Sequence, residues 1–363
     1  MRRNQKLLLV AALLLLLAGL GNRTYFKRQH QMLHLDARIE TAQATPTVNL
    51  LLGGFRGVVA DWLWIRVMLL QEQGRFVEIL QLAEWITGLQ PQFPDIWILH
   101  AWNITYNITV LLPDGLERWH WVRHGYEILR DQAIPATGFH PRICAEIAWI
   151  LMHKIGGTTD DFADTLFLQW MRGIEPLLEP DGRLPADAKR RISALAHIGM
   201  SEAMMADFEA NFGSHDWRHP LTHAAAWAYT GFTLHPGTEG TSLAERLFLS
   251  TYRQLFLQGT ITNDDGDIIL RPDLARLEGV RKAFAAASSR TMQPSFRETH
   301  LMTLELIARI LLAHGQYESA RDTFNEITRR FPQSEIALRG FAALTANAQL
   351  PQPRRIETYG AHR

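Results

Sequence analysis

The hydrophobic and polar positions of this chain follow a helical spacing over most of its length. Apolar residues recur at intervals of three and four positions, and capping residues stand at the starts of several of these segments. Asp114 is followed by Glu117, and Ser242 by Glu245, which is the spacing of a capping box. The pattern predicts that helices make up more than half of the chain.

Two segments depart from the helical pattern. In TITNDDGDIIL, short β-branched runs flank Asp265 and Gly266, a pair typical of a tight turn between antiparallel strands. We therefore predict one small β-hairpin in an otherwise all-α fold. The tail, 349–363, has prolines, few apolar residues and no period, so it is predicted to be disordered.

One helical pattern occurs twice, because GRFVEILQLAEWITGLQP and GQYESARDTFNEITRRFP align without a gap. In each copy a glycine ends one helix, an aromatic residue anchors the next helix, small or apolar residues form its buried stripe, and a proline stops it. The equivalent positions are Gly74 with Gly315, Phe76 with Tyr317, Ile79 with Ala320, Ala83 with Phe324, Ile86 with Ile327, and Pro91 with Pro332.

Both copies resemble tetratricopeptide repeats (TPR), helix pairs of about 34 residues that stack into a superhelix. The C-terminal copy matches this family better than the N-terminal one, which has Arg66 where a large apolar residue is usual. The resemblance implies a TPR-like α-solenoid of antiparallel helix pairs. The first helix of the C-terminal copy has an apolar stripe of Leu304, Ile307, Ala308 and Leu311.

The N-terminus has the layout of a membrane-targeting segment. Basic residues precede and follow an uninterrupted apolar run from Leu7 to Gly21. We expect an uncleaved, single-pass anchor over 1–27 in a bacterial inner membrane, with the body of the protein on the periplasmic side. The block from GFRGVVADWLWIRVMLLQEQGRF to HAWNITYNI is also similar to the start of membrane-anchored bacterial proteins of unassigned role.

The rest of the chain is predicted to divide by pattern into a linker, repeat-like ends and a middle part. A polar linker follows the anchor, and the helix pairs at both ends enclose a helical region without clear repeats. The predicted segments are 28–47 (linker), 48–112 (N-terminal TPR-like pairs), 113–300 (irregular helical middle) and 301–348 (C-terminal TPR and capping helix).

Composition narrows the classes of function. The chain has 37 Lys and Arg against 37 Asp and Glu, and its formal net charge of zero argues against nucleic acid as a partner. Its single cysteine, Cys144, lies among apolar residues and is expected to be a buried hydrophobe. No motif for nucleophilic catalysis is present, so we expect a binding protein without a cofactor rather than an enzyme.

The segment SHDWRHPLTHAAAW places His215, His219 and His223 at intervals of four. On one continuous helix, three imidazoles at that spacing could approach a zinc ion. Pro220 fits best in the first turn of a helix, so His215 and His219 are expected to precede that helix, with His219 as its cap. We expect structural histidines, and a metal-dependent hydrolase is the alternative.

Most of the eleven tryptophans lie in the first half of the chain, where they form either a bulky helical core or the anchors of a protein interface. On the second interpretation, residues that share helical faces line a groove for another protein, such as an envelope or membrane protein. A rival interpretation places the segment ADWLWIRVMLL at the membrane surface. The predicted groove residues are Asp61, Trp64, Met68, Ile98, Trp102, Tyr106, Glu305 and Arg309.

Overall fold

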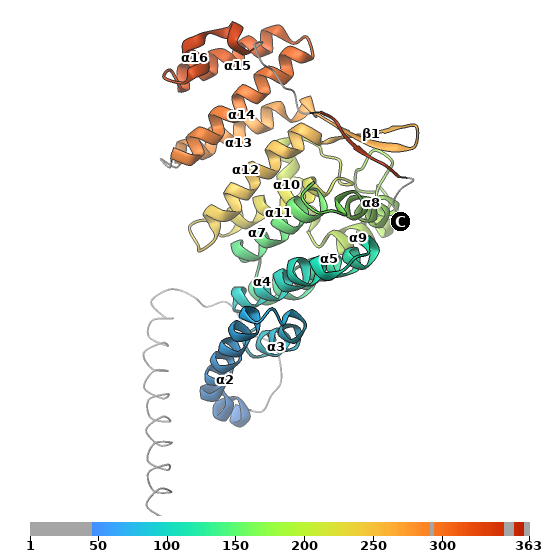
Figure 1. Cartoon of the computed structure of the whole chain (residues 1–363), viewed down its shortest axis with the longest axis vertical. Helices are drawn as coiled ribbons and strands as arrows, with labels where there is room; N and C mark the ends of the chain where they lie inside the picture. Colours follow the sequence, from blue (N-terminus) through green and yellow to red (C-terminus); the bar gives the residue numbers. More distant parts are fainter. Residues whose placement is uncertain (1–45, 291–293, 345–351, 359–363) are drawn as a thin grey trace, which may run out of the picture. The chain divides into compact units, whose positions relative to one another are not determined.

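The computed structural model describes residues 46–290, 294–344 and 352–358. Over these residues the chain is mostly helical with a small antiparallel sheet, which confirms the prediction of an all-α fold with one excursion (Figure 1). The chain divides into two compact units between Gln90 and Pro91. The predicted anchor lies outside the described residues, among which no helix is long and apolar enough to cross a membrane.

In the first unit, the described residues form a pair of helices, α2 (Pro46–Glu72) and α3 (Phe76–Leu89). Gly74 has a φ of +68° in the turn between them, a conformation that glycine adopts without strain. The two helices pack through apolar residues spaced by three and four positions. The buried residues of this seam are Ala60, Leu63, Val67 and Leu70 on α2 and Ile79, Ala83 and Ile86 on α3.

The second copy of the pattern folds in the same way, as α14 (Pro294–Ala313) and α15 (Tyr317–Arg330). Gly315 has a φ of +72°, and α15 ends one residue before Phe331, whose N–H donates to the Ile327 carbonyl. Gln90 makes the equivalent bond to Ile86 at the end of α3. The prediction that Gly74 and Gly315 each lie at a turn between helices is confirmed.

One detail of the repeat prediction is wrong. Tyr317 was expected to anchor the second helix of its pair, but its side chain is 67% exposed. The core beneath α15 is instead completed by Phe324 and Phe331 together with Leu304 and Ile327. An aromatic residue at the first position of a helix has no neighbour to pack on here, because the buried stripe begins three positions later at Ala320.

The second unit contains the remaining helices. It begins with a run of helical elements that changes type several times and has short breaks at 112–114 and 138–140. This run comprises α4 (Pro94–Trp102), the π-helix η1 (Asn103–Ile108), the 3-10 turn η2 (Thr109–Leu111), α5 (Gly115–Ile128), the π-helix η3 (Leu129–Ala133), α6 (Ile134–Thr137), α7 (Pro141–Trp149) and the π-helix η4 (Ile150–Ile155). The elements that follow are α8 (Ala163–Ile174), η5 (Glu175–Leu177), α9 (Ala188–Ile198), α10 (Glu202–Phe212), α11 (Pro220–Leu234), α12 (Thr241–Gln258), η6 (Leu274–Arg276), α13 (Leu277–Arg290), α16 (Glu335–Arg339) and η7 (Phe341–Leu344).

The core of the second unit lies where α7, α11 and α12 pack together (Figure 1). Small residues bring α7 and α11 close, since a Cβ on Gly231 would lie 2.8 Å from the Cβ of Cys144. Cys144 is fully buried at this contact, as predicted. Large aromatic side chains fill the rest of the core, among them Trp217, Trp227, Tyr252, Phe248 and Phe256.

The capping predictions have different outcomes. The Asp114 carboxylate accepts hydrogen bonds from the N–H groups of Leu116 and Glu117 at the start of α5, as expected. Ser242 is not a cap, because it lies inside α12, which begins at Thr241 with Gly240 in the N-cap position. Gly240 has a φ of +88°, which turns the chain into the helix and leaves Ser242 within its first turn.

The predicted hairpin is present as β1 (Thr260–Asp264) and β2 (Asp267–Arg271), which pair antiparallel. Asp265 and Gly266 form its two-residue turn with φ angles of +51° and +90°, as a type I′ turn requires. The turn therefore has the conformation that the Asp-Gly signal predicts.

Part of the tail that was predicted to be disordered is a strand, β3 (Arg354–Ile356), which pairs antiparallel with β2. Ile356 is fully buried against Phe167 and Leu270, and Arg354 donates to the Gly156 carbonyl at 2.9 Å. A short segment without a period of its own gains order here from an exposed sheet edge and a neighbouring apolar pocket. The prediction of disorder is wrong for these residues.

We expect Gly125→Ala to destabilise the second unit by about 1–3 kcal/mol, because packing extra volume into a tight contact displaces the neighbouring element. A Cβ on Gly125 of α5 would lie 2.2 Å from Oγ1 of Thr105 in η1. Gly173→Ala is the matched control, since a Cβ there meets nothing within 4 Å and the change favours the helix. Urea unfolding followed by circular dichroism measures both, and equal stabilities would contradict the close packing of α5 on η1.

Candidate recognition site

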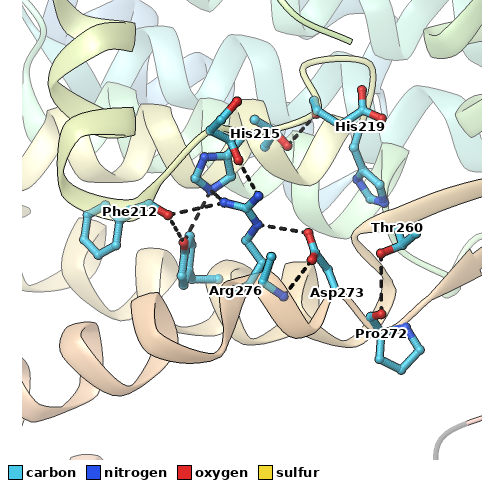
Figure 2. Close-up of polar contacts among 12 residues, drawn as sticks. Phe212, His215, His219, Thr260, Pro272, Asp273 and Arg276 are labelled. Atoms are coloured by element: carbon cyan, nitrogen blue, oxygen red, sulfur yellow. Dashed lines mark hydrogen bonds and ion pairs between the residues drawn. The ribbon is translucent and has the colours of Figure 1, made fainter. Parts of the chain in front are cut away.

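The three histidines that suggested a metal site lie around the start of α11 but face different neighbours, as Figure 2 shows for His215 and His219. His219 is the N-cap of α11, as predicted, and its Nδ1 accepts from the Leu221 N–H at 3.1 Å. Its Nε2 is 3.0 Å from the Gln258 carbonyl, to which it therefore donates. His223 donates through Nε2 to the Trp217 carbonyl at 2.6 Å. Each ring is thus held by a separate backbone group.

His215 belongs to a buried network around Arg276 (Figure 2). Arg276 donates to the Phe212 carbonyl at 3.3 Å, to the Ser214 carbonyl and to Asp273 at 2.9 Å. It also lies 3.3 Å from Nε2 of His215, which must accept because a guanidinium only donates. The ring nitrogen that would bind a metal is therefore turned toward a cation, which opposes metal binding.

These contacts give the histidines a structural role. Within the parts of the chain that the structure describes, no group of three His, Cys, Asp or Glu side chains could hold a metal ion. Burial lowers the pKa of His215 to about 3 and those of His219 and His223 to about 4, so all three rings are neutral near pH 7. They join α11 to α10, α12 and η6 instead of forming a reactive centre.

A different group of side chains gathers where two π-helices meet α7. Tyr106 lies on η1, Glu146 and Trp149 lie on α7, and His153 lies on η4. Isolated π-helical turns are rare and often occur at functional sites, because the extra residue in the turn changes the direction of the side chains. We call Tyr106, Glu146, Trp149 and His153 the η1–η4 cluster.

Stacked rings give the η1–η4 cluster its shape. Trp102, at the end of α4, stacks on Tyr106 with 4.3 Å between ring centroids, and Trp149 stacks on His153 with 4.6 Å. The Tyr106 and His153 rings are 5.8 Å apart and tilted, which joins the two stacks. Trp102 remains 38% exposed, so one end of this aromatic wall faces solvent.

Asp160 forms buried ion pairs with Lys154 and Arg118 next to the cluster. Lys154 follows His153 on η4, and its Nζ donates to Asp160 at 2.5 Å. Asp160 also pairs with Arg118 of α5 at 3.2 Å, and the three side chains are nearly inaccessible to solvent. The Lys154 ammonium lies 5.2 Å from the centre of the Tyr106 ring, in cation–π range. This network fixes η1, η4 and α5 relative to one another.

The cluster contains several buried polar atoms without hydrogen bonds. Within the described residues, Oε1 of Glu146 and Nδ1 of His153 make no hydrogen bond. The Tyr106 hydroxyl and Nε1 of Trp149 make none of ordinary geometry, although Trp149 still acts on the Tyr106 hydroxyl as a weak donor that lowers its pKa slightly. Each such group costs about 1–3 kcal/mol of stability when it is left unpaired in a protein interior. Four such atoms lie together beside the exposed edge of Trp102, and a bound molecule that completes their hydrogen bonds would explain them.

The burial of these groups changes their protonation. Burial raises the pKa of Glu146 to about 7, and Arg142 lowers it by a smaller amount. Burial also raises the pKa of Tyr106, with a further contribution from the Glu146 carboxylate, and it lowers the pKa of His153. Near pH 7 the cluster therefore holds a neutral phenol, a neutral imidazole and a carboxyl group close to half ionisation.

We expect Glu146→Gln to stabilise the protein increasingly as the pH rises from 5 to 8. The folded-state pKa of Glu146, about 7, exceeds the ordinary value of 4.5, so the folded wild type holds a proton between these values and then carries a buried charge above pH 7. The gain in unfolding free energy should grow from near zero at pH 5 to about 1–3 kcal/mol at pH 8. Glu202→Gln, at an exposed glutamate, is the control. If the gain in unfolding free energy of Glu146→Gln did not change with pH, the raised pKa of Glu146 would be contradicted.

The predicted groove residues are distributed over both units. Trp102 and Tyr106 do come together, and Ile98 lies one turn earlier on α4, half-buried. Asp61 and Met68 are exposed on α2 in the first unit, where Trp64 is half-buried. Two further groove residues, Glu305 and Arg309, lie one turn apart on α14, both half-buried. The prediction thus includes the aromatic edge of the η1–η4 cluster.

Sequence reasoning missed Glu146, Trp149 and His153. Their only local signal is the run CAEIAWILMHK, in which polar residues recur at intervals of three and four inside an apolar helix. That spacing places them on one face, but it does not show that this face meets η1. A hollow of about 260 Å³ in the same unit, lined by residues such as Trp119, Arg123 and Arg130, is less suited to binding, because both arginines already have carboxylate partners.

Comparisons with known proteins do not extend this description. No protein-family model matches the chain, and no curated protein or solved structure was found to match it. The fold defines the class of this protein only as mostly helical with a small antiparallel sheet. Its function must be inferred from the residues of the site.

Proposed function

We propose that this chain is a membrane-anchored, TPR-like helical scaffold that binds a segment of another protein at the η1–η4 cluster. The observation that carries the proposal is the set of buried, unpaired polar atoms on Tyr106, Glu146, Trp149 and His153. These groups lower the stability of the free protein, and a bound chain would supply the missing hydrogen bonds in the complex. The proposal assigns no catalytic step to these groups.

The surroundings of the cluster favour a protein segment over a small molecule. Trp102, Tyr106 and Val110 are spaced by four residues along the continuous helical backbone of α4, η1 and η2. Val110 is 61% exposed and neighbouring Leu111 is 63% exposed, so apolar surface continues beyond the rings. Trp102 is exposed and Tyr106 is half-buried beside these apolar residues, and tryptophan and tyrosine are common anchors of protein interfaces. The partner would present an apolar side chain beside polar backbone groups.

The repeat-like geometry supports the scaffold part of the proposal. The α2–α3 and α14–α15 pairs share their glycine turns, the length of the second helix (14 residues) and the hydrogen bond at its C-terminal end. In the C-terminal part, α12, α13, α14, α15 and α16 each pack on the next helix in chain order (Figure 1). Neighbour-to-neighbour packing of this kind is how solenoids are built, and they commonly serve as binding platforms.

The proposed setting is a bacterial envelope assembly. The apolar run from Leu7 to Gly21, with basic residues on both sides, supports anchoring of the chain in the inner membrane with its helical body on the periplasmic side. A scaffold in this position would bind an envelope or membrane protein. It would need no cofactor, and its even charge balance does not suit nucleic acid.

Site-specific photo-crosslinking in native membranes tests this function. A photoreactive side chain is placed at Trp102 of the full-length chain, beside the cluster, and at Leu234 as a control that is also exposed in the same unit. We expect a discrete crosslinked protein from position 102 and none from position 234. Equal crosslinking at both positions, or none at either, would show that the cluster is not the binding surface.

A further inference from the structure

The face of α2 opposite its contact with α3 carries a stripe of exposed apolar side chains. Val58, Trp62, Ile65 and Leu69 are 64%, 63%, 59% and 45% exposed. Large apolar residues that form a contiguous exposed stripe of this kind mark an interaction surface. The stripe cannot serve the packing of the helix pair, because α2 already contacts α3 through Ala60, Leu63, Val67 and Leu70 on its other side.

The spacing of the stripe is that of a helix made to pack on another helix. Successive members are separated by four, three and four positions, which is a heptad repeat with Val58 and Ile65 at d and Trp62 and Leu69 at a. In the sequence, Leu51 and Phe55 extend the same spacing toward the N-terminus. Val59 and Met68, which are 44% and 59% exposed, flank this seam at e and g positions and widen the apolar face. The heptad spacing at the centre of the face favours a helical partner.

The charges beside the stripe identify the partner. In this heptad register, Asp61 falls at a g position and Arg66 at the following e position, five residues later. Both are exposed, and neither makes an ion pair with the residues that the structure describes. When two copies of such a helix lie parallel, the g residue of each faces that e residue of the other, so Asp61 meets Arg66 twice. An antiparallel pair would place like charges together.

We propose that α2 associates in parallel with α2 of another copy of this chain. The apolar stripes form the seam between the copies, and two symmetric Asp61–Arg66 pairs across it set the orientation. This surface lies in the first unit, so the inference is independent of the η1–η4 cluster and of its binding partner. Copies held by the same N-terminal segment in one membrane would meet in this parallel orientation, at a high local concentration.

Charge exchange on the full-length chain in detergent tests the orientation. Asp61→Arg alone and Arg66→Asp alone should each weaken self-association about tenfold, because attraction becomes repulsion on both sides of the seam. The double variant should regain the wild-type association. A mixture of the two single variants should form mixed assemblies, since each variant supplies the charge that the other needs. Analytical ultracentrifugation measures the association of each sample.

Cysteine crosslinking gives an independent test of the seam. In a parallel pair, Ile65→Cys lies opposite its own copy and should form an intermolecular disulfide on mild oxidation. Val77→Cys, on the exposed side of α3, is the control and should not, while the native Cys144 is fully buried. A monomeric wild type, a double charge variant that stays weak, or no crosslink at position 65 would each overturn the proposal. Those results would leave the stripe to lipid or to another segment.

Discussion

Lowering the pH from 7 to 4.5 is expected to unfold the second unit. Buried, neutral histidines lie throughout its helical core, and burial is the largest cause of their low pKa values. The pKa is about 3 for His215 and about 4 for His100, His219, His223 and His300. The unfolded chain binds protons at these rings at a higher pH than the folded chain does, so acid favours unfolding.

The sign of this effect follows from the two pKa values of each ring. The folded-state pKa is depressed below the ordinary value of 6.5, so the stabilising contribution is fully present above pH 6.5 and is lost as the pH falls toward 4. Each ring contributes up to about 3 kcal/mol by pH 4. Since a typical domain is stable by only about 5–15 kcal/mol, several such rings together exceed its stability. Glu146 acts in the opposite direction, because its pKa is raised to about 7.

Urea unfolding at pH 7.5, 6.5, 5.5 and 4.5, followed by circular dichroism, measures this dependence. His219→Asn is the informative variant, because asparagine can still cap α11 but does not titrate. The variant starts from a lower stability, having lost the bond to the Gln258 carbonyl, and its stability should fall less steeply below pH 6.5. A wild type that is as stable at pH 4.5 as at pH 7.5 would contradict the assignment of buried, neutral rings.

The parts of the fold that were predicted correctly depend on short-range signals. Gly74 and Gly315 lie at helix turns because the backbone there needs a positive φ, and the Asp-Gly pair at 265–266 forms a type I′ turn for the same reason. These requirements act within a few residues, so the sequence shows them directly. The strand at Arg354–Ile356 depends on pairing with β2, far away in the chain, and the sequence around it gives no sign of that edge.

The candidate site was only half visible for a similar reason. Trp102 and Tyr106 fall on one face at the ordinary spacing of four, so pattern reasoning found them. The π-helical turns in η1 and η4 were not predicted, because the sequence around them has the spacing of three and four that an ordinary helix has. The position of Glu146 and His153 beside Tyr106 comes from the packing of elements that are not adjacent in the chain.

The exposed apolar face of α2 differs from the face that the sequence pattern predicted. Trp64 was assigned to the groove, but it is half-buried, and Trp62 is the tryptophan that faces solvent. Asp61, Trp64 and Met68 do share a face, but the exposed stripe is centred on Trp62 and Ile65, about a quarter turn or more away. The direction of α3 decides which face is covered, and this is known only from the structure.

Tyr106→Phe is expected to make the protein more stable and to weaken its binding of the partner. The change removes a buried hydroxyl that makes no hydrogen bond of ordinary geometry among the described residues, and it leaves the stacked ring in place. The unfolding free energy should rise by about 1 kcal/mol, because an unpaired polar group no longer has to be buried. Binding should weaken about tenfold, because the hydrogen bond that the hydroxyl donates to the partner is lost.

Tyr252→Phe is the matched control for this change. Its hydroxyl donates to the Phe212 carbonyl at 3.2 Å in the core, so the change removes a buried hydrogen bond and should lower the unfolding free energy by about 1 kcal/mol, although Arg276 still donates to that carbonyl. Tyr252 is fully buried, and its hydroxyl contacts Phe212 and His215 rather than a residue of the η1–η4 cluster. Partner binding should therefore not change. The two substitutions are chemically identical, and only their surroundings separate the expected results.

The most direct test of the η1–η4 cluster as a recognition site is to measure both properties on the same preparations of the full-length chain. The unfolding free energy in urea and the amount of crosslink formed from position 102 in native membranes are compared for wild type, Tyr106→Phe and Tyr252→Phe. We expect Tyr106→Phe to raise the unfolding free energy and to reduce the amount of crosslinked product. We expect Tyr252→Phe to lower the unfolding free energy and to leave the amount of crosslinked product unchanged. A Tyr106→Phe variant that loses stability, or that crosslinks as the wild type does, would contradict the assignment of the cluster as a recognition site.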